Sequence, residues 1–377
     1  MALPEIGNKV YFPKLNVLRF LSAFAIFLMH IVISWRGKNA NTELLRDSTG
    51  LSGHINIFIA NMTLGVDVFF LISGFLITYL LLREKELTNK IDLKKFFARR
   101  ILRIWPLYFL LIAITPFILR KNNLPVSEYI SSLLFVENFR QLQTMTSLQP
   151  FGHLWSICIE EHFYLVWPFI IAFVNKKWLM PLFSTILATS AAFVLFTSIT
   201  NQVDPSWVIY HHTLSRIDVL VVGAIIAYYY HYYSFKINFP VYVQLLIYAA
   251  LGFACFYTLA YYYPSPITTL AKRYGFILVI TIAVLNYTFN SNDIFKFMNT
   301  AWLEYLGKIS YGIYMFTPFV LKFVHTILMQ RLHITNFYVY TVIMLIPGIL
   351  VPIISYEFFE KPFLKLKGRF EIIRTLG

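Results

Sequence analysis

Charged side chains are scarce in this sequence. Asp, Glu, Lys and Arg together make up 13% of its 377 residues, whereas a soluble domain has about 25%. Hydrophobic residues reach 58%, and the mean hydropathy is +0.64. No polar stretch is long enough to form a soluble domain of about 50 residues. These absences exclude an ordinary soluble protein and predict a single membrane-embedded domain over residues 1–377, with no appended soluble domain.

Cysteine and the common cofactor-binding motifs are almost absent. Cys158 and Cys255 both lie inside apolar segments, so we expect neither a disulfide framework nor a cysteine metal site. The histidine pair His211 and His212 lacks a matching Asp/Glu/His cluster, so we interpret it as interfacial and expect no bound metal. The first 14 residues lack the apolar core and cleavage site of a signal peptide, so the first helix is expected to target the chain.

Apolar runs of the length that crosses a bilayer, about 20 residues each, are abundant instead. They predict an all-α, polytopic membrane bundle of about ten transmembrane helices. The predicted spans are residues 15–34, 56–82, 97–119, 153–174, 178–199, 213–232, 241–261, 272–290, 305–327 and 336–358.

Lysine and arginine are distributed unevenly between the two sides of this predicted bundle. With an even number of spans both termini lie on one side, which holds 20 of the 32 Lys and Arg residues, against nine on the other side. Three more, Arg19, Arg216 and Lys322, fall within spans. Because cytoplasmic loops carry the excess of positive charge, we expect both termini in the cytoplasm and the chain in a bacterial inner membrane.

Three loops stand out under this orientation. The cytoplasmic loop 83–103 is the densest basic patch in the chain. It either binds a phosphate-bearing ligand or only satisfies topology and touches anionic lipid. Loops 35–55 and 120–152 face outward, and the apolar residues of segment 127–139 favour a helix that lies in the interface or re-enters from it.

The apolar helix predicted from Leu15 to His30 carries two polar groups. Arg19 and His30 are eleven residues apart, three helical turns plus about 20°, so both project from one face about 16 Å apart. An ionisable side chain in hydrocarbon costs roughly 2.5–3.5 kcal/mol, which makes such residues functional candidates. The alternative is that Arg19 extends to the near interface and His30 lies among the headgroups of the far one.

Acidic residues also interrupt the apolar spans. Glu160 and Glu161 are adjacent, so their side chains point about 100° apart. We expect one to act in the chemistry and the other to find a structural partner, unless both only join helices. Asp67 is expected to orient or charge-pair a histidine or arginine of another span, or to cap its own helix. Arg216 and Asp218 are interpreted as members of structural pairs with other spans.

Basic residues open the third predicted span at the cytoplasmic interface: Arg99, Arg100 and Arg103. Arg100 and Arg103 are three residues apart and share a helix face, which gives two forked donors suited to phosphate oxygens. Ser310 and Tyr311 lie on the ninth predicted span, where they either contact a ligand or line the helix core.

Together these stretches resemble the membrane-bound acyltransferase family 3, the bacterial integral-membrane acyltransferases that mostly O-acetylate saccharides. The resemblance covers essentially the whole chain and rests on the order and spacing of its segments. They read LRFLSAFAIFLMH, with the family's Arg, ten residues and His, then GVDVFFLISGFLIT, FFARRILRIWPLY, HLWSICIEEHFYLVWPF, SRIDVLVVGAIIA, LGKISYGIYMFTPF and YEFFEKPF.

The resemblance implies an acyl-CoA donor, usually acetyl-CoA, and a saccharide or glycan acceptor. It also implies that the donor phosphates lie at Arg100 and Arg103 and that transfer requires Arg19 and His30. In our hypothesis the pantetheine arm enters the bundle from the inside. His30, oriented by Asp67 or a neighbouring glutamate, then deprotonates an acceptor hydroxyl or carries the acyl group itself. The predicted donor-binding residues are Arg99, Arg100, Arg103, Ser310 and Tyr311, and the predicted catalytic residues are His30, Arg19, Glu160, Glu161 and Asp67.

The chain departs from the family pattern at two positions. Thr317 stands where many relatives have a histidine before the proline of that segment, and His162 stands where glutamine is common. We expect no extension after Gly377, whereas some relatives append an extracytoplasmic hydrolase-like transferase domain. We therefore expect this chain to act alone on its acceptor or to hand acyl groups to a separate protein.

Two other functions stay open. A proton-coupled transporter would use His30, Glu160 and Asp67 as a relay and the basic loop only for topology. An acyltransferase of the same kind could also act on a hydroxyl of a lipid, a peptide or a small molecule.

Overall fold

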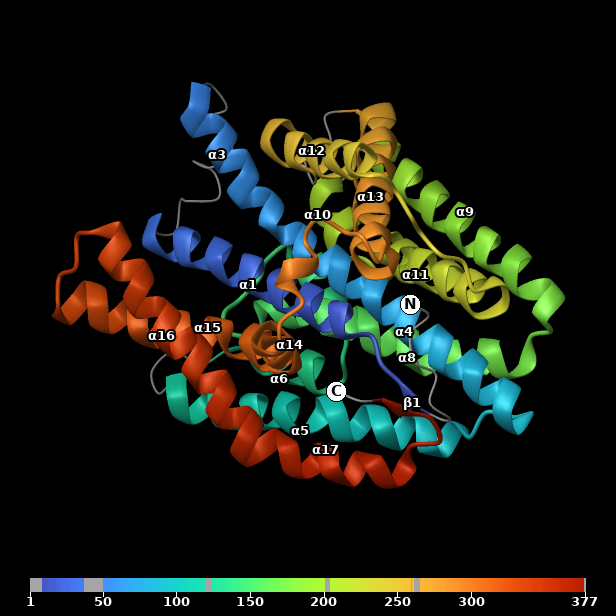
Figure 1. Ribbon diagram of the computed structural model, residues 1–377. Helices are drawn as coiled ribbons and strands as arrows, with labels where there is room; N and C mark the ends of the chain where they lie inside the picture. Colours follow the sequence, from blue (N-terminus) through green and yellow to red (C-terminus); the bar gives the residue numbers. More distant parts are fainter. Residues whose placement is uncertain are drawn as a thin grey trace.

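The computed structural model describes residues 9–36, 50–119, 124–200, 204–258, 260 and 265–375. These residues form an all-α bundle with α1 and α4 near its middle (Figure 1). The long helices are α1 (Pro13–Arg36), α4 (Gly65–Thr88), α5 (Leu93–Leu119), α8 (Trp155–Phe173), α9 (Lys176–Thr200), α11 (Thr213–Tyr233), α12 (Val241–Tyr257), α13 (Pro266–Phe289), α15 (Ser310–Thr326) and α16 (Phe337–Ser355). The shorter helices are α3 (Gly50–Asn61), α6 (Val126–Leu133), α7 (Glu137–Thr144), α10 (Pro205–His211), α14 (Ala301–Lys308) and α17 (Lys361–Lys367). Single turns of 3₁₀ helix lie at Met62–Leu64, Gly152–Leu154, Lys296–Met298 and Gly368–Phe370, and π-helical turns at Ile327–Arg331 and Tyr356–Glu360.

Nine helical segments of the described residues are long and apolar enough to cross a membrane. The remaining predicted span, 241–261, corresponds to α12, which has 17 residues and ends at Tyr257. Ile237 and Asn290 form an isolated backbone bridge. The ends of α11 and α13 therefore lie on one side of the bundle, and α12 runs back from that side toward the start of α13. The structure confirms the all-α polytopic bundle.

One predicted span is divided in the structure. The apolar run 305–327 belongs to two helices, because α14 ends at Lys308 and α15 begins at Ser310. A Cβ atom added at Gly307 would lie 2.1 Å from the carbonyl oxygen of Asn16. The last turn of α14 therefore packs directly on the backbone of α1, and the spanning helix starts only after this contact.

The predicted outward loops are partly helical. Of loop 35–55, residues 37–49 lie outside the described residues, and α3 begins at Gly50. Segment 127–139 contains most of α6 and the start of α7 rather than one helix. Leu134, between these two helices, is 66% exposed, as expected for a side chain at a lipid interface.

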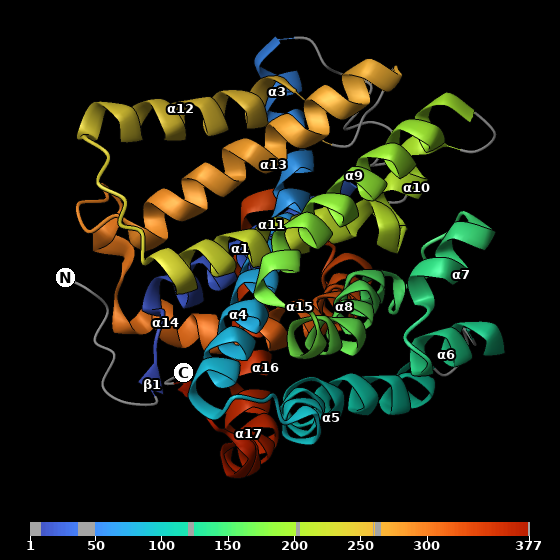
Figure 2. The same ribbon diagram turned by 90° about the vertical axis from the view of Figure 1, so that its right-hand side faces the viewer.

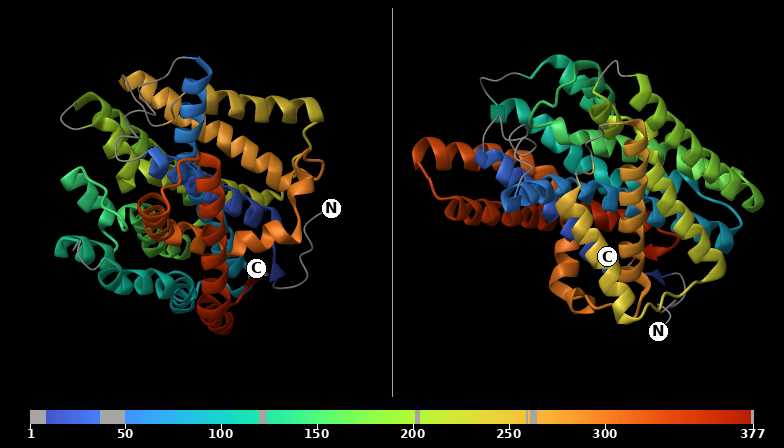
Figure 3. Two further views of the ribbon diagram at one scale, coloured as in Figure 1. Left: turned by 90° about the vertical axis from the view of Figure 1, so that its left-hand side faces the viewer. Right: turned by 90° about the horizontal axis from the view of Figure 1, so that it is seen from above.

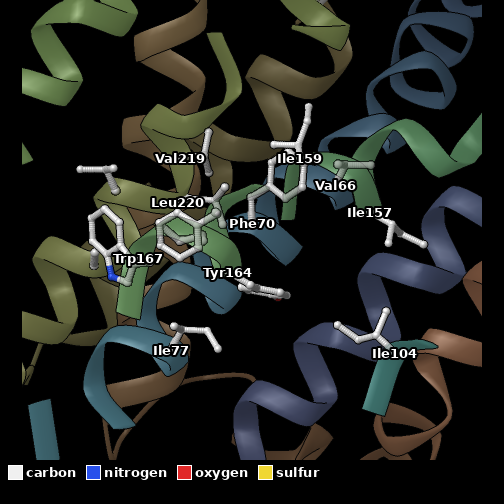
Figure 4. Close-up of a cluster of buried hydrophobic side chains, with 14 of the residues drawn as sticks. Val66, Phe70, Ile77, Ile104, Ile157, Ile159, Tyr164, Trp167, Val219 and Leu220 are labelled. Atoms are coloured by element: carbon white, nitrogen blue, oxygen red, sulfur yellow. The ribbon is translucent and has the colours of Figure 1, made fainter. Parts of the chain in front are cut away.

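The core is densest where α4 meets α11. A Cβ atom at Gly74 would lie 1.9 Å from the Leu220 carbonyl oxygen, and one at Gly223 would lie 2.2 Å from the Leu71 carbonyl oxygen. Glycine is needed at these two crossings because any side chain would separate the helices. Figure 4 shows apolar side chains from α4, α8 and α11 filling the space beside this contact.

Two buried ion pairs join α11 to its neighbours. Arg216 pairs with Asp67 of α4 at 3.0 Å, and Asp218 pairs with Arg273 of α13 at 2.6 Å. Arg216 and Asp218 are thus members of structural pairs, as predicted. The predicted span 272–290 starts later than the helix, because α13 begins at Pro266, and Arg273 is only 3% exposed. The first turns of this helix contain polar residues, so the hydropathy pattern did not assign them to the span.

The first and last described segments lie together. Strand β1 (Lys9–Val10) pairs in parallel with β2 (Arg374–Thr375), and Figures 2 and 3 show the first and last described segments on the same side of the bundle. Figure 1 shows α17 running beside α5 near this point. A chain that crosses the membrane an even number of times begins and ends on the same side, which agrees with this pairing. Its location on the cytoplasmic side stays a prediction.

Candidate active site

A cavity of about 340 Å³ lies where the first and last described segments meet. Residues of α1, α4 and α5 line it together with the C-terminal segment 356–373. Its basic lining residues are Arg19, Arg99, Arg100, Arg103, Lys308, Lys365 and Lys367, and its acidic ones are Glu84, Glu360 and Glu371. The cavity therefore carries a clear excess of positive charge.

Two of these basic residues hold the mouth of the cavity together. Arg99 pairs with Glu84 at 3.0 Å and donates to the Phe370 carbonyl oxygen at 2.8 Å. Lys367 pairs with Glu371 at 3.1 Å. Arg99 was predicted to bind the donor, and the structure does place it in the cavity wall. Its charge, however, is already paired there, and it fastens the C-terminal segment to α5.

Arg100 and Arg103 face the same cavity, as their spacing predicts. The Arg100 guanidinium lies 5.6 Å from the centre of the Tyr164 ring, and its buried Nε has no hydrogen-bond partner. Arg19 of α1 lies close enough to repel both arginines, while Glu160 attracts it. Three guanidinium groups from two helices thus converge on one space.

A second, smaller cavity of about 90 Å³ continues inward from the first. The two cavities share Arg19, Ser73, Arg100, Arg103, Tyr164 and Tyr311. The inner cavity adds Glu160, Ser156 and Tyr314 among its polar lining residues. A narrow continuation of this kind suits a slender chain that follows a charged head into the bundle.

The adjacent glutamates diverge. Glu160 lines the inner cavity and accepts hydrogen bonds from Ser73 at 2.8 Å and Tyr164 at 3.2 Å. Glu161 instead accepts from the Trp105 indole at 3.2 Å. The geometry thus agrees with the expectation that only one of the two would face a site.

His30 is not among the residues that line the two cavities. It is close enough to His153 to interact electrostatically with it. His153 in turn contacts the inner cavity through Tyr314, whose hydroxyl donates to the His153 carbonyl oxygen at 2.7 Å. Arg19 and His30, the two polar groups of α1, are therefore connected through the residues at the inner end of the cavity.

The other predicted site residues fall into two groups. Tyr311 lines both cavities and donates to the Ile104 carbonyl oxygen at 2.9 Å, and Ser310 lines the inner one. Asp67 pairs with Arg216, whose guanidinium lies 5.6 Å from the centre of the Trp155 ring. This pairing matches the prediction that Asp67 would meet an arginine from another span.

The positions that depart from the family pattern are internally bonded. Thr317 is buried and donates to the Ile313 carbonyl oxygen at 2.7 Å. His162 bonds to Thr213 at 3.0 Å and to the Phe135 carbonyl oxygen at 2.9 Å.

His211, predicted to be interfacial, is instead only 4% exposed, because α10 folds back over the bundle. Burial lowers the pKa of His211 to about 4.

Several residues of the site were missed by sequence reasoning. Glu360 lines the outer cavity at the end of a π-helical turn and lies close enough to Arg103 to attract it. Tyr164 and His153 belong to the same apolar run as Glu160, and the four-residue spacing from Glu160 to Tyr164 was the available signal. In the described residues no group of three or more His, Cys, Asp or Glu side chains is arranged to hold a metal ion.

An acidic cluster on α6 and α7 was also missed. Arg140 pairs with Glu137 at 2.6 Å and with Glu128 at 3.1 Å, and both carboxylates are fully buried. Burial, and then the neighbouring Glu137, raise the pKa of Glu128 to about 7. Gln141 joins Glu137 to the Gly152 carbonyl oxygen, at 3.0 and 2.8 Å. The cluster thus holds the turn that precedes His153.

Comparison with known proteins gives a consistent result. A family model described as an acyltransferase domain matches residues 12–357. O-acetyltransferase OatA of Staphylococcus aureus (strain NCTC 8325 / PS 47) is 29% identical over 384 residues, which cover 96% of this chain and 59% of the relative. A putative O-acetyltransferase of S. aureus strain COL is 28% identical over 376 residues, covering 94% and 58%. The chain thus spans less than two thirds of the length of these relatives. No solved structure matches it.

Proposed function

The chain belongs to the acyltransferase domain family, and from this premise we propose that it is an O-acyltransferase that moves an acetyl group from acetyl-CoA to a hydroxyl of a saccharide or glycan. The observation that carries the proposal is the convergence of Arg19, Arg100 and Arg103 on one cavity. Like charges held close inside a bundle repel one another, so the arrangement favours a polyanionic ligand. The phosphates of coenzyme A meet that need.

The chemistry of the arginines supports a phosphate ligand rather than a lone carboxylate. Guanidinium groups present forked donors that match phosphate oxygens in pairs. Arg100 and Arg103 supply two such forks on one helix face. Lys308 and Lys365 add positive charge at the rim. We place the nucleotide end of the donor in the outer cavity and its pantetheine arm in the inner one.

The reacting groups follow from this placement. The thioester would reach the inner cavity near Ser156 and Tyr314. His30 deprotonates the acceptor hydroxyl there, or carries the acyl group itself. Glu160 balances part of the charge of Arg19. We assign Glu161 and Asp67 to positioning, because Trp105 and Arg216 hold them.

The membrane orientation is part of the proposal. Placing both termini in the cytoplasm opens the outer cavity to the compartment that contains acetyl-CoA. The same orientation directs His30 toward the outer side of a bacterial inner membrane. An acceptor glycan at that face would then meet the acyl group without crossing the bundle.

The deciding experiment is transfer of labelled acetyl from acetyl-CoA in membranes containing the native chain or His30→Ala, followed by mass analysis of the labelled product. His162→Gln is the matched control, because it replaces a histidine that bonds only to structural partners. We expect native and control membranes to label one glycan and the His30→Ala membranes to fail. Equal labelling in all three would refute the role of His30.

Binding of CoA separates this function from a proton-coupled transporter. We expect the purified protein to bind CoA and Arg100→Gln to weaken that binding. A native protein that neither binds CoA nor transfers acetyl would favour transport. Label found in a lipid or a small molecule would keep the enzyme and change its acceptor.

A further inference from the structure

His153 is a buried histidine to which the function proposed above gives no role. It lies in the 3₁₀ turn before α8 and is 8% exposed. Neither ring nitrogen has a partner with hydrogen-bond geometry, although the Pro150 backbone lies close enough to attract an imidazole N–H. A buried polar group left without a partner is energetically unfavourable. A bound ligand that forms a hydrogen bond with the imidazole would remove this cost.

The neighbouring hydroxyl groups at this end of the cavity are already engaged. Tyr314 donates to the His153 carbonyl oxygen at 2.7 Å. The Ser156 hydroxyl lies 2.7 Å from that of Tyr314 and 3.4 Å from the same carbonyl oxygen. A neutral imidazole always carries one N–H. Among these three residues, therefore, only the His153 ring has a donor available for a substrate.

The backbone fixes where this donor is. Gln141 holds the Gly152 carbonyl oxygen at 2.8 Å, immediately before His153. The Tyr314 ring packs against the imidazole at 5.3 Å between ring centres. His30 lies within electrostatic reach on the other side. The ring thus packs on Tyr314, which lines the inner cavity, and lies within electrostatic reach of His30.

We propose that His153 is a second catalytic imidazole, whose N–H donates to the acyl carbonyl oxygen while His30 takes the proton of the acceptor hydroxyl. This inference rests on the proposed function. A neutral imidazole can polarise a carbonyl group as a hydrogen-bond donor. A donor placed before the reaction at the site of developing charge stabilises the transition state strongly.

In this transfer, each bond that forms is matched by one that breaks. The acceptor O–H bond breaks, its proton moves to His30, and the oxygen forms a bond to the acyl carbon. The electron pair of the carbonyl moves to its oxygen, which the His153 N–H holds. When that pair returns, the C–S bond breaks, and the departing thiolate takes the proton from His30. His153 stays neutral throughout.

The test uses the full-length protein, acetyl-CoA labelled with ¹³C at the carbonyl, and three variants: His153→Leu, His153→Gln and the control His162→Gln. Infrared difference spectra measure the carbonyl stretch of the bound thioester without any acceptor. We expect a shift to lower frequency in the native protein and the control, its loss in His153→Leu, and its partial return in His153→Gln, whose amide keeps an N–H.

Labelled acetyl transfer gives the second readout. We expect His153→Leu to lower the transfer rate by roughly 100- to 1,000-fold, with CoA affinity within about threefold of native, and His153→Gln to recover part of that rate. Native transfer by His153→Leu, or loss of CoA binding in both His153 variants, overturns the proposal in favour of a packing role. Absence of transfer in the native protein itself refutes the proposed function instead.

Discussion

Arg273 and Arg103 both lie inside the helix bundle, but they meet opposite surroundings. Arg273 donates to both carboxylate oxygens of Asp218, at 2.6 and 2.8 Å, and the pair is closed off from solvent. Arg103 lines two cavities beside Arg19 and Arg100. A buried charge with its own partner joins two helices. Like charges that line one cavity repel each other instead, and an anionic ligand in the cavity offsets that repulsion. Similar residues thus serve structure in one region and binding in the other.

Arg140 is a third case, because two buried carboxylates pair with this single guanidinium. Glu128 and Glu137 both face its guanidinium from within the cluster of α6 and α7. When both carboxylates are charged, the cluster carries a net negative charge without solvent. The ratio of acids to arginine therefore differs among the three regions, and each ratio predicts a different response to mutation.

The largest effect is expected when the closed pair is broken. Asp218→Asn leaves the Arg273 charge buried without its carboxylate, so we expect the free energy of unfolding to fall by about 3–5 kcal/mol. Thermal unfolding in detergent measures this loss. The matched control is Glu86→Gln, which breaks the pair with Arg83, where Glu86 is 53% exposed. Exposed pairs contribute about 1 kcal/mol or less. Equal losses in the two variants would contradict the comparison.

A smaller effect, of the opposite kind, is expected in the cavity. Arg103→Gln removes one of three mutually repelling charges, so we expect the folded protein to be as stable as the native one or more stable. CoA affinity should fall by roughly 10- to 100-fold, since a hydrogen bond to a charged group contributes about 1.5–3 kcal/mol. Calorimetric titration with CoA and a melting curve check both statements. A destabilised variant with native CoA affinity would place Arg103 among the structural arginines.

The placement of side chains on one helix could be predicted from the sequence, whereas the contacts between helices could not. Helical spacing correctly placed Arg100 and Arg103 in one cavity wall and separated Glu160 from Glu161. Pairing depends instead on which helices meet, so neither the partner of Asp67 nor the burial of Arg273 could be derived from local pattern. The catalytic assignments, His30 first among them, stay predictions.

The same limit explains two errors along the chain. The apolar run 305–327 read as one span because hydropathy does not register the contact of Gly307 with the α1 backbone. His153 was passed over because a histidine at a span boundary has the pattern of an interfacial residue. Only the three-dimensional structure shows that its ring is buried and that the neighbouring hydroxyl groups are engaged elsewhere.

The smallest effect concerns the cluster of Arg140, and it depends on pH. The pKa of Glu128 is raised from 4.5 to about 7 in the folded protein, first by burial and then by Glu137, with Arg140 opposing both. The folded state therefore binds more protons than the unfolded state between these values, and stability falls as pH rises from 4.5 through 7. We expect the native melting temperature to drop by a few degrees between pH 5 and pH 8. Glu128→Gln, which stays neutral, should lose this part of the drop and melt above the native protein at pH 8. Because Arg140 keeps Glu137 in that variant, a lower melting temperature at pH 8 would mean that the second carboxylate stabilises the cluster, and that one acid is too few for this arginine.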